Sequence, residues 1–196
     1  MDIIVNGLFD LSKDKTYVII TENRNEVGTL KIENGEYTVK TKNNDKPITF
    51  TDASELREWL GDEYILATES YRWHEWNPNP LNNSKATDCT IRAYCAAERI
   101  LWNEAFDIAC RKGKETAWMP NDNKCVHEIC ENYFGYQYAK IPKEQKGMTV
   151  KEFAIAHPEG TYLVEVPRHL VAVINGEYWD SWDSGAKKVK GWYYKD

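Results

Sequence analysis

Apolar and polar residues alternate between turn signals through residues 1–50, which is the period-two pattern of strands with one buried face. Two of these runs flank Asn34-Gly35, a dipeptide that favours a tight hairpin with a type I′ turn. The segment DASELREWLG, residues 52–61, then predicts a short helix closed by a glycine. Residues 1–67 are therefore expected to form a small β-rich lobe, which contains no histidine, no cysteine and no glycine-rich phosphate loop.

The pattern changes after this lobe. Residues 68–85 are rich in proline, asparagine and aromatic residues, and they predict a connector without regular structure. Beyond the connector, apolar residues recur at helical spacing, and the pattern predicts four helices, over residues 87–100, 103–113, 121–135 and 148–157. The second of these helices is expected to stop at Gly113.

The C-terminal segment predicts strands alone. Runs rich in valine and aromatic residues, separated by turn dipeptides, cover residues 160–166, 169–174, 177–182 and 187–194. Helices followed by an antiparallel sheet indicate an α+β fold. We expect residues 68–196 to form this domain, preceded by the lobe of residues 1–67.

The net charge and the number of cysteines restrict the classes of binding partner and the cellular compartment expected for this chain. The chain carries 25 Lys and Arg against 31 Asp and Glu, a formal net charge of −6, which disfavours binding to nucleic acid. No apolar run reaches the roughly 18 residues of a membrane span, and the acidic N-terminus MDIIVNGLFD lacks the pattern of a signal peptide. Five cysteines, an odd number, fit free thiols in a reducing compartment, so a cytoplasmic location is expected.

Cys89 stands at the predicted start of a helix, where unpaired backbone N–H groups and the helix dipole favour thiolate over thiol. Such a nucleophile needs a base, and His169 is the best of four candidates because it opens an apolar strand that would hold its ring in one direction. Cys125, His127 and Cys130 include no CxxC pair, and no second cluster completes four ligands. We therefore expect neither a metal nor a cofactor.

The hairpin after His169 places an acid on the histidine's side of the sheet. With Asn175-Gly176 as the turn, the residue numbers of each pair across the hairpin sum to 351. Because successive side chains of a strand point to opposite faces, Asp180 shares the face of His169 and Asp183 lies on the other face. An acid in this position can orient an imidazole and stabilise the imidazolium. A three-residue loop or a single β-bulge would exchange the roles of the two aspartates.

The chain order of these residues resembles that of the papain-like cysteine peptidases. It is a cysteine at a helix start, then a histidine at a strand start, then an acid on the next strand. The local forms TDCTIRA and HLVAVINGEYWDSWD are more similar to bacterial and phage members, including bacteriocin-processing peptidases, than to papain itself. The resemblance covers about residues 80–196 and implies a papain-like catalytic domain with a Cys89-His169-Asp180 triad. The family also uses a glutamine six residues before the cysteine as an oxyanion-hole donor. Asn83 stands at that spacing here, its neighbour Asn82 is the alternative, and the backbone N–H of Cys89 would be the second donor.

The resemblance implies a thiol hydrolase that cleaves a peptide or isopeptide bond in a protein or peptide substrate. The same triad would also serve an amidase, a deamidase or an acyl-transferase, because the first half-reaction is shared. A hypothesis of a different class is a non-catalytic binding or structural protein of a phage, with the N-terminal lobe as its working surface.

Overall fold

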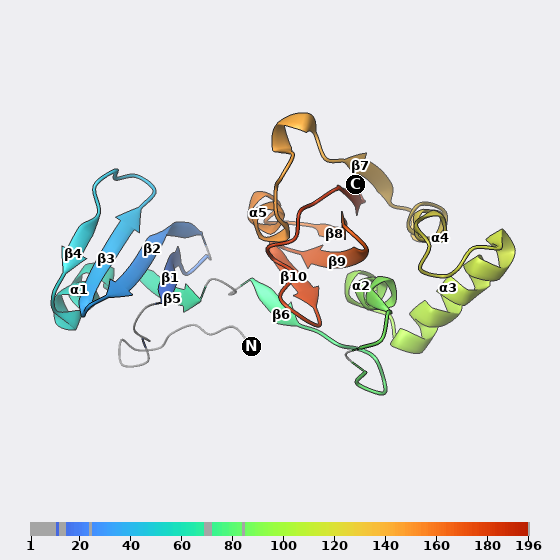
Figure 1. Ribbon diagram of the computed structural model, residues 1–196, viewed down its shortest axis with the longest axis horizontal. Helices are drawn as coiled ribbons and strands as arrows, with labels where there is room; N and C mark the ends of the chain where they lie inside the picture. Colours follow the sequence, from blue (N-terminus) through green and yellow to red (C-terminus); the bar gives the residue numbers. More distant parts are fainter. Residues whose placement is uncertain (1–10, 12–14, 24, 69–71, 84, 196) are drawn as a thin grey trace. The chain divides into compact units, whose positions relative to one another are not determined.

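The computed structural model of the 196-residue chain describes residues 11, 15–23, 25–68, 72–83 and 85–195. The chain divides into two compact units, Met1–Tyr71 and Arg72–Asp196. Each unit is built around its own sheet (Figure 1). The N-terminal decapeptide MDIIVNGLFD, with any strand expected in it, lies outside the described residues.

The N-terminal unit contains an antiparallel sheet with the strand order β4-β3-β2-β1-β5. The strands are β1 Thr16–Thr21, β2 Glu26–Glu33, β3 Glu36–Thr41, β4 Ile48–Phe50 and β5 Tyr64–Thr68. Helix α1, Ala53–Leu60, packs Leu56 and Leu60 into the core of this sheet. Asn34 and Gly35 both adopt positive φ and Glu33 pairs with Glu36, so the predicted hairpin is confirmed.

The C-terminal unit contains a second sheet with the order β6-β10-β9-β8-β11-β7. Its strands are β6 Trp73–Glu75, β7 Gln137–Lys140, β8 Thr161–Val166, β9 His169–Ile174, β10 Glu177–Asp180 and β11 Gly191–Tyr194. Every pair is antiparallel except β6 and β10, which run parallel. With the helices described next, the unit has the α+β architecture that the sequence predicted.

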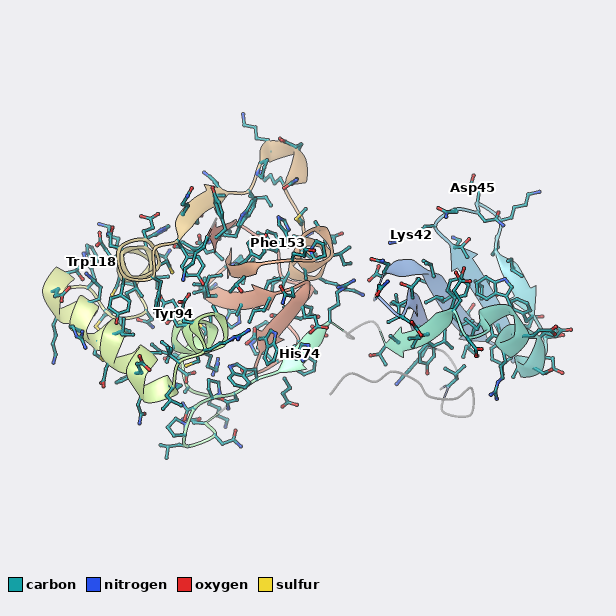
Figure 2. The ribbon with its side chains drawn as sticks, turned by 180° about the vertical axis from the view of Figure 1, so that it is seen from behind. Lys42, Asp45, His74, Tyr94, Trp118 and Phe153 are labelled. Atoms are coloured by element: carbon teal, nitrogen blue, oxygen red, sulfur yellow. The ribbon has the colours of Figure 1, made fainter. Side chains whose placement is uncertain are left out.

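Helices cover both faces of this second sheet. They are α2 Cys89–Glu98, α3 Trp102–Thr116, α4 Asn123–Glu128 with the π-helix η2 Ile129–Tyr133, the short η3 Lys143–Gln145, and α5 Val150–Ala156. Side chains of α2, α3 and α4 form one core with Leu163, Leu170 and Ala172 of the sheet. Alternate residues of the same strands, Val164, Val171 and Val173, form another core with α5. Figure 2 labels a large side chain from each core, Tyr94 and Phe153.

Three elements differ from the prediction. The connector is not wholly irregular, because β6 within it pairs with the edge of β10. A further short strand, β7, pairs with β11. Helix α3 also continues through Gly113 to Thr116, and a Cβ at Gly113 would lie 2.8 Å from the Trp118 carbonyl oxygen. This glycine therefore permits a close approach of the chain and does not end the helix.

Candidate active site

Cys89 is the first residue of α2 and its side chain is half-buried. Helix α2 packs against β9, and its first turn reaches the end of the sheet where β9 begins. There the sulfur lies close enough to the His169 ring and to the backbone of Leu170 for both to act on its ionisation. Burial alone would raise the pKa of the Cys89 thiol, but the hydrogen bond and charge of His169, with smaller contributions from Leu170 and Arg92, bring it below its ordinary value.

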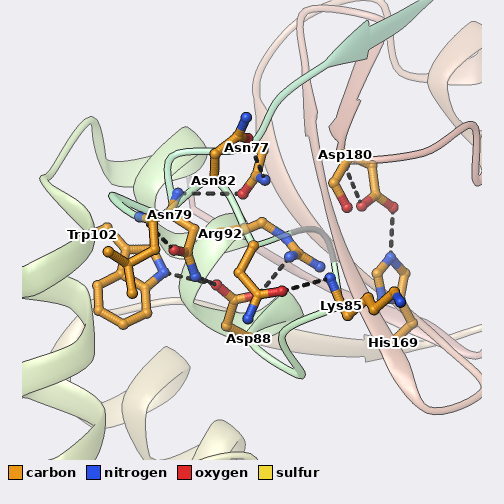
Figure 3. A network of polar contacts seen from close by, with 12 residues as sticks. Asn77, Asn79, Asn82, Lys85, Asp88, Arg92, Trp102, His169 and Asp180 are labelled. Atoms are coloured by element: carbon orange, nitrogen blue, oxygen red, sulfur yellow. Dashed lines mark hydrogen bonds and ion pairs between the residues drawn. The ribbon is translucent and has the colours of Figure 1, made fainter.

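His169 follows the two-residue turn Pro167-Arg168 and opens β9. Arg168 adopts a φ of 59°, a left-handed conformation that reverses the chain directly before the histidine. The Nε2 of His169 lies 2.5 Å from Asp180 Oδ2 and is hydrogen-bonded to it (Figure 3). With Nε2 engaged by the carboxylate, the other ring nitrogen, Nδ1, is the one left for the Cys89 sulfur.

The hairpin register explains why Asp180 reaches the ring. Ile174 pairs with Glu177 and Ala172 with Trp179, which is the register predicted from the Asn175-Gly176 turn. The Asp180 side chain is 3% exposed and its second oxygen, Oδ1, accepts a hydrogen bond from the Ser181 N–H at 2.8 Å. Two hydrogen bonds from different directions therefore hold the carboxylate in place beside the histidine.

The charges of Asp180 and Cys89 also set the protonation of His169. Burial by itself would lower the pKa of the imidazole, but the hydrogen bonds from its two partners and their negative charges raise it to about 9. A cysteine of lowered pKa beside a histidine of raised pKa favours a thiolate–imidazolium pair, which titrates as a unit. Both shifts therefore favour the ionised form of Cys89 over the neutral thiol.

Asp183 takes a different role. Its Oδ1 accepts hydrogen bonds from the Tyr178 hydroxyl at 2.7 Å and from the Gly185 N–H at 3.0 Å. Asp183 therefore organises the loop after β10. The ring of Trp182, a residue between the two aspartates in the sequence, has its centroid 5.3 Å from that of the His169 ring. Trp182 is 40% exposed and covers one side of the histidine from solvent.

The other cysteines contrast with Cys89. Burial raises the pKa of Cys95 to about 12, and burial also raises the pKa values of Cys125 and Cys130. All three are buried in the core between the helices and the sheet. Of these three cysteines and Cys89, only Cys89 has surroundings that favour ionisation.

A buried polar cluster lies directly before Cys89. Asp88, 7% exposed, accepts hydrogen bonds from Arg92 at 2.5 Å and from Asn79 and Trp102 at 2.9 Å each (Figure 3). Arg92 is itself 6% exposed, so the two charges face each other almost without solvent. The cluster ties the start of α2 to the preceding loop and to α3, and thereby fixes the position of Cys89.

Replacing Asp88 with alanine is expected to lower the free energy of unfolding by about 3–5 kcal/mol, because the Arg92 charge would remain buried without its partner. Asp88→Asn keeps a hydrogen-bond acceptor and is expected to lose less. Guanidinium denaturation measures both variants, with the exposed Asp107→Ala on α3 as a control within about 0.5 kcal/mol of wild type. A loss below about 1 kcal/mol for Asp88→Ala would contradict this view of the cluster.

A cavity of about 580 Å³ opens in front of the cysteine and the histidine. Its walls come from α2, α4, the β8–β9 turn and the loop after β10, and they include Cys89, Arg92, Val126, His127, Arg168, His169, Trp182 and Tyr193. His127, one of the three histidines not chosen as the base, is hydrogen-bonded through Nδ1 to the Tyr193 hydroxyl at 2.8 Å. Its position on this wall depends on contacts between α4 and β11, for which the sequence carries no local signal.

The structure places Asn83 apart from this arrangement. Its side chain is exposed, and its oxygen accepts a hydrogen bond from the Lys85 N–H at 3.1 Å within its own turn. Asn83 is not among the residues that line the cavity. The neighbouring Asn82 oxygen likewise accepts a hydrogen bond from Asn77. In this conformation the backbone N–H of Cys89 is the nearest expected donor to an oxyanion, since the first N–H groups of a helix have no partner within it.

Within the described ranges, no group of three or more His, Cys, Asp or Glu side chains could hold a metal ion, and no helix is long and apolar enough to cross a membrane. Comparisons of this chain with protein-family models, with curated proteins and with solved structures find no match.

Proposed function

We propose that this chain is a thiol hydrolase that cleaves peptide or isopeptide bonds with Cys89, His169 and Asp180. The observation that carries the proposal is that Cys89 and His169 line one cavity, close enough for the imidazole to lower the pKa of the thiol, while Asp180 is hydrogen-bonded to the same ring. Such an arrangement, with a nucleophile, a base and a group that orients the base, is the common requirement of nucleophilic hydrolases.

The proposed reaction begins with the Cys89 thiolate and the His169 imidazolium. The sulfur attacks the carbonyl carbon of the substrate, and the carbonyl π-electrons move to the oxygen to give a tetrahedral oxyanion. The imidazolium gives its Nδ1 proton to the leaving amine as the C–N bond breaks, which leaves a thioester on Cys89. His169, now neutral, takes a proton from water, and the resulting hydroxide attacks the thioester. The S–C bond breaks, the acid product leaves, and the thiolate–imidazolium pair is restored.

Asp180 supports both halves of this cycle without giving or taking the transferred proton. Its hydrogen bond to Nε2 keeps the ring turned so that Nδ1 faces the sulfur, and its charge stabilises the imidazolium. The oxyanion would form beside the first turn of α2, where the Cys89 N–H and the positive end of the helix dipole stabilise negative charge.

A papain-like arrangement belongs to the same proposal. Its support is the order of the elements: a helix that begins with the cysteine packs on an antiparallel sheet whose strands bring the histidine and the acid. The cavity has two walls. Side chains of α2 and α4 form one wall, and side chains of β8, β9 and the loop after β10 form the other. This arrangement fits a cleft that receives an extended chain.

Selective alkylation tests the proposed nucleophile. At about pH 6, iodoacetamide should modify Cys89 at least 10-fold faster than Cys110, a half-buried cysteine on α3, because the histidine keeps Cys89 ionised below the usual thiol range. Peptide mapping by mass spectrometry gives both rates in one sample. His169→Ala should remove most of the Cys89 preference. Equal labelling of the two cysteines in the wild-type protein would refute the proposal.

A further inference from the structure

A second cavity, of about 500 Å³, adjoins the candidate active site. Four of its ten lining residues are lysines, Lys140, Lys146, Lys188 and Lys190, although the chain as a whole carries a net charge of −6. All four lysines are exposed, and within the described part of the chain none of their ammonium groups forms a salt bridge. We call this the lysine-rimmed cavity.

The lysine-rimmed cavity and the active-site cavity share two lining residues, Glu165 and Lys190. The two cavities therefore adjoin at the end of β8. Arg168, on the turn beside His169, adds a further cation to the active-site side. The basic side chains thus extend from the neighbourhood of the histidine across the lysine-rimmed cavity.

Glu165 is the one carboxylate among the described lining residues, and it is engaged, as is Glu152 beside Lys188. Glu165 accepts a hydrogen bond from the Tyr138 hydroxyl at 2.9 Å, and Glu152 interacts with the backbone and hydroxyl of Thr149 while it faces Lys188. Lys188 also donates a hydrogen bond to the Gly147 carbonyl at 3.0 Å. Positive charge therefore dominates the rim, and Ile141, Pro167 and Val189 give the cavity an apolar part.

Given the proposed function, we propose that the substrate is an acidic polypeptide segment, whose carboxylates bind the lysine-rimmed cavity while the scissile bond lies beside Cys89. Four cations around one concave site attract a chain of carboxylates at distances within the Debye length, about 8–10 Å at physiological ionic strength. The apolar part of the cavity accommodates small apolar side chains interspersed among the acids. Substrate choice would then depend on charge several residues away from the bond that is cleaved.

A polypeptide fits this cavity better than a nucleic acid. Proteins that bind single strands without sequence preference usually place stacking aromatics along a basic groove. The lysine-rimmed cavity has a single aromatic residue, Tyr138, whose hydroxyl is engaged by Glu165.

Binding is measured on the full chain with the Cys89→Ala substitution, so that the probe is not consumed. The probe is a fluorescein-labelled decapeptide of alternating Glu and Ala, and its counterparts carry Gln or Lys in place of Glu. Fluorescence anisotropy should show the Glu peptide binding at least 10-fold more tightly than the Gln peptide, with an affinity that falls between about 50 and 300 mM salt. The Lys peptide should not bind.

Paired charge reversals locate the site. Lys140→Glu/Lys146→Glu should weaken binding of the Glu peptide about 10-fold or more, and Lys140→Gln/Lys146→Gln should weaken it less. Arg111→Glu/Lys114→Glu, at two exposed positions on α3, makes the same change in net charge and should stay within about 3-fold of the parent. Thermal melting verifies that each variant folds.

Three results would overturn the inference: equal binding of the Glu and Gln peptides, equal losses in the two charge-reversed pairs, or tighter binding of a single-stranded oligonucleotide of equal charge. The last of these would assign the cavity to nucleic acid. Because this assay does not use the nucleophile, its failure with a reactive Cys89 would leave the proposed hydrolase standing. Tight binding with an inert Cys89 would instead refute the hydrolase and keep the acidic partner.

Discussion

Cys89→Ala is expected to abolish the proposed peptide cleavage, with a loss of about 10⁴-fold or more, because alanine provides no nucleophile and the other two members of the proposed triad cannot replace it. The measurement is incubation of the protein with a complex peptide mixture, followed by mass spectrometry of the new termini. Peptides with acidic segments should supply most of the cleaved products if the lysine-rimmed cavity binds substrate.

The alanine variant should remain folded. Cys89 is the first residue of α2 and half-buried, and alanine is the best helix former, so the expected change in unfolding free energy is within about 1 kcal/mol. Cys110→Ala is the matched control, because it removes a half-buried thiol from another helix and should keep the wild-type rate. Cleavage by Cys89→Ala at the wild-type rate would show that another residue is the nucleophile.

The sequence was most informative where the chemistry is local. The Asn175-Gly176 turn permits a two-residue hairpin, and the alternation of side chains then decides that Asp180 and not Asp183 lies with His169. No distant contact enters that deduction. The start of α2 at Cys89 is local in the same way, because a change to helical spacing marks it in the sequence.

Elements that depend on a distant partner were not predictable. Strand β6 has three residues, too few for a period-two pattern, and exists because the edge of β10 offers it backbone hydrogen-bonding groups. Gly113 resembles a helix stop in the sequence, but it is a glycine because the chain at Trp118 returns against it. Both features depend on segments that are brought close only by the tertiary fold.

The supporting parts of the candidate site also come from tertiary contacts. Asp88 occupies the N-cap position of α2, but its side chain makes no cap hydrogen bond and binds Arg92, Asn79 and Trp102 instead. An aspartate before a helix usually accepts a backbone N–H. Here a buried arginine one turn later offers a stronger partner, because a charge without solvent must be neutralised nearby. The position of Asp88 before the helix does not reveal this interaction, because its partners are fixed by the tertiary fold.

Asp180→Ala is expected to lower the rate of cleavage by about 10–10⁴-fold, because the imidazole loses both the bond that orients it and the charge that favours its protonated form. Asp183→Ala is the matched control. It removes a carboxylate three residues away that binds Tyr178 and Gly185, and it should stay within a few-fold of wild type. The reverse order of effects would show that the loop after β10 controls catalysis.

The pH profile separates orientation from simple loss of structure. Asp180 raises the pKa of His169, so the imidazolium of the wild-type protein persists until the pH rises through about 9, and activity should fall above that point. Without the carboxylate the imidazolium is lost at lower pH, and the alkaline limb of the profile must move toward neutrality.

Asp180→Asn distinguishes the two contributions of the carboxylate. Its amide oxygen can still accept the hydrogen bond from Nε2, so the ring stays oriented and the loss of rate should be smaller than in the alanine variant. Its missing charge should nevertheless shift the alkaline limb in the same direction, because one part of the pKa elevation of His169 is electrostatic. An unshifted limb in both variants, with a reduced rate, would mean that Asp180 supports the fold of the β9–β10 hairpin and takes no part in setting the protonation of the histidine.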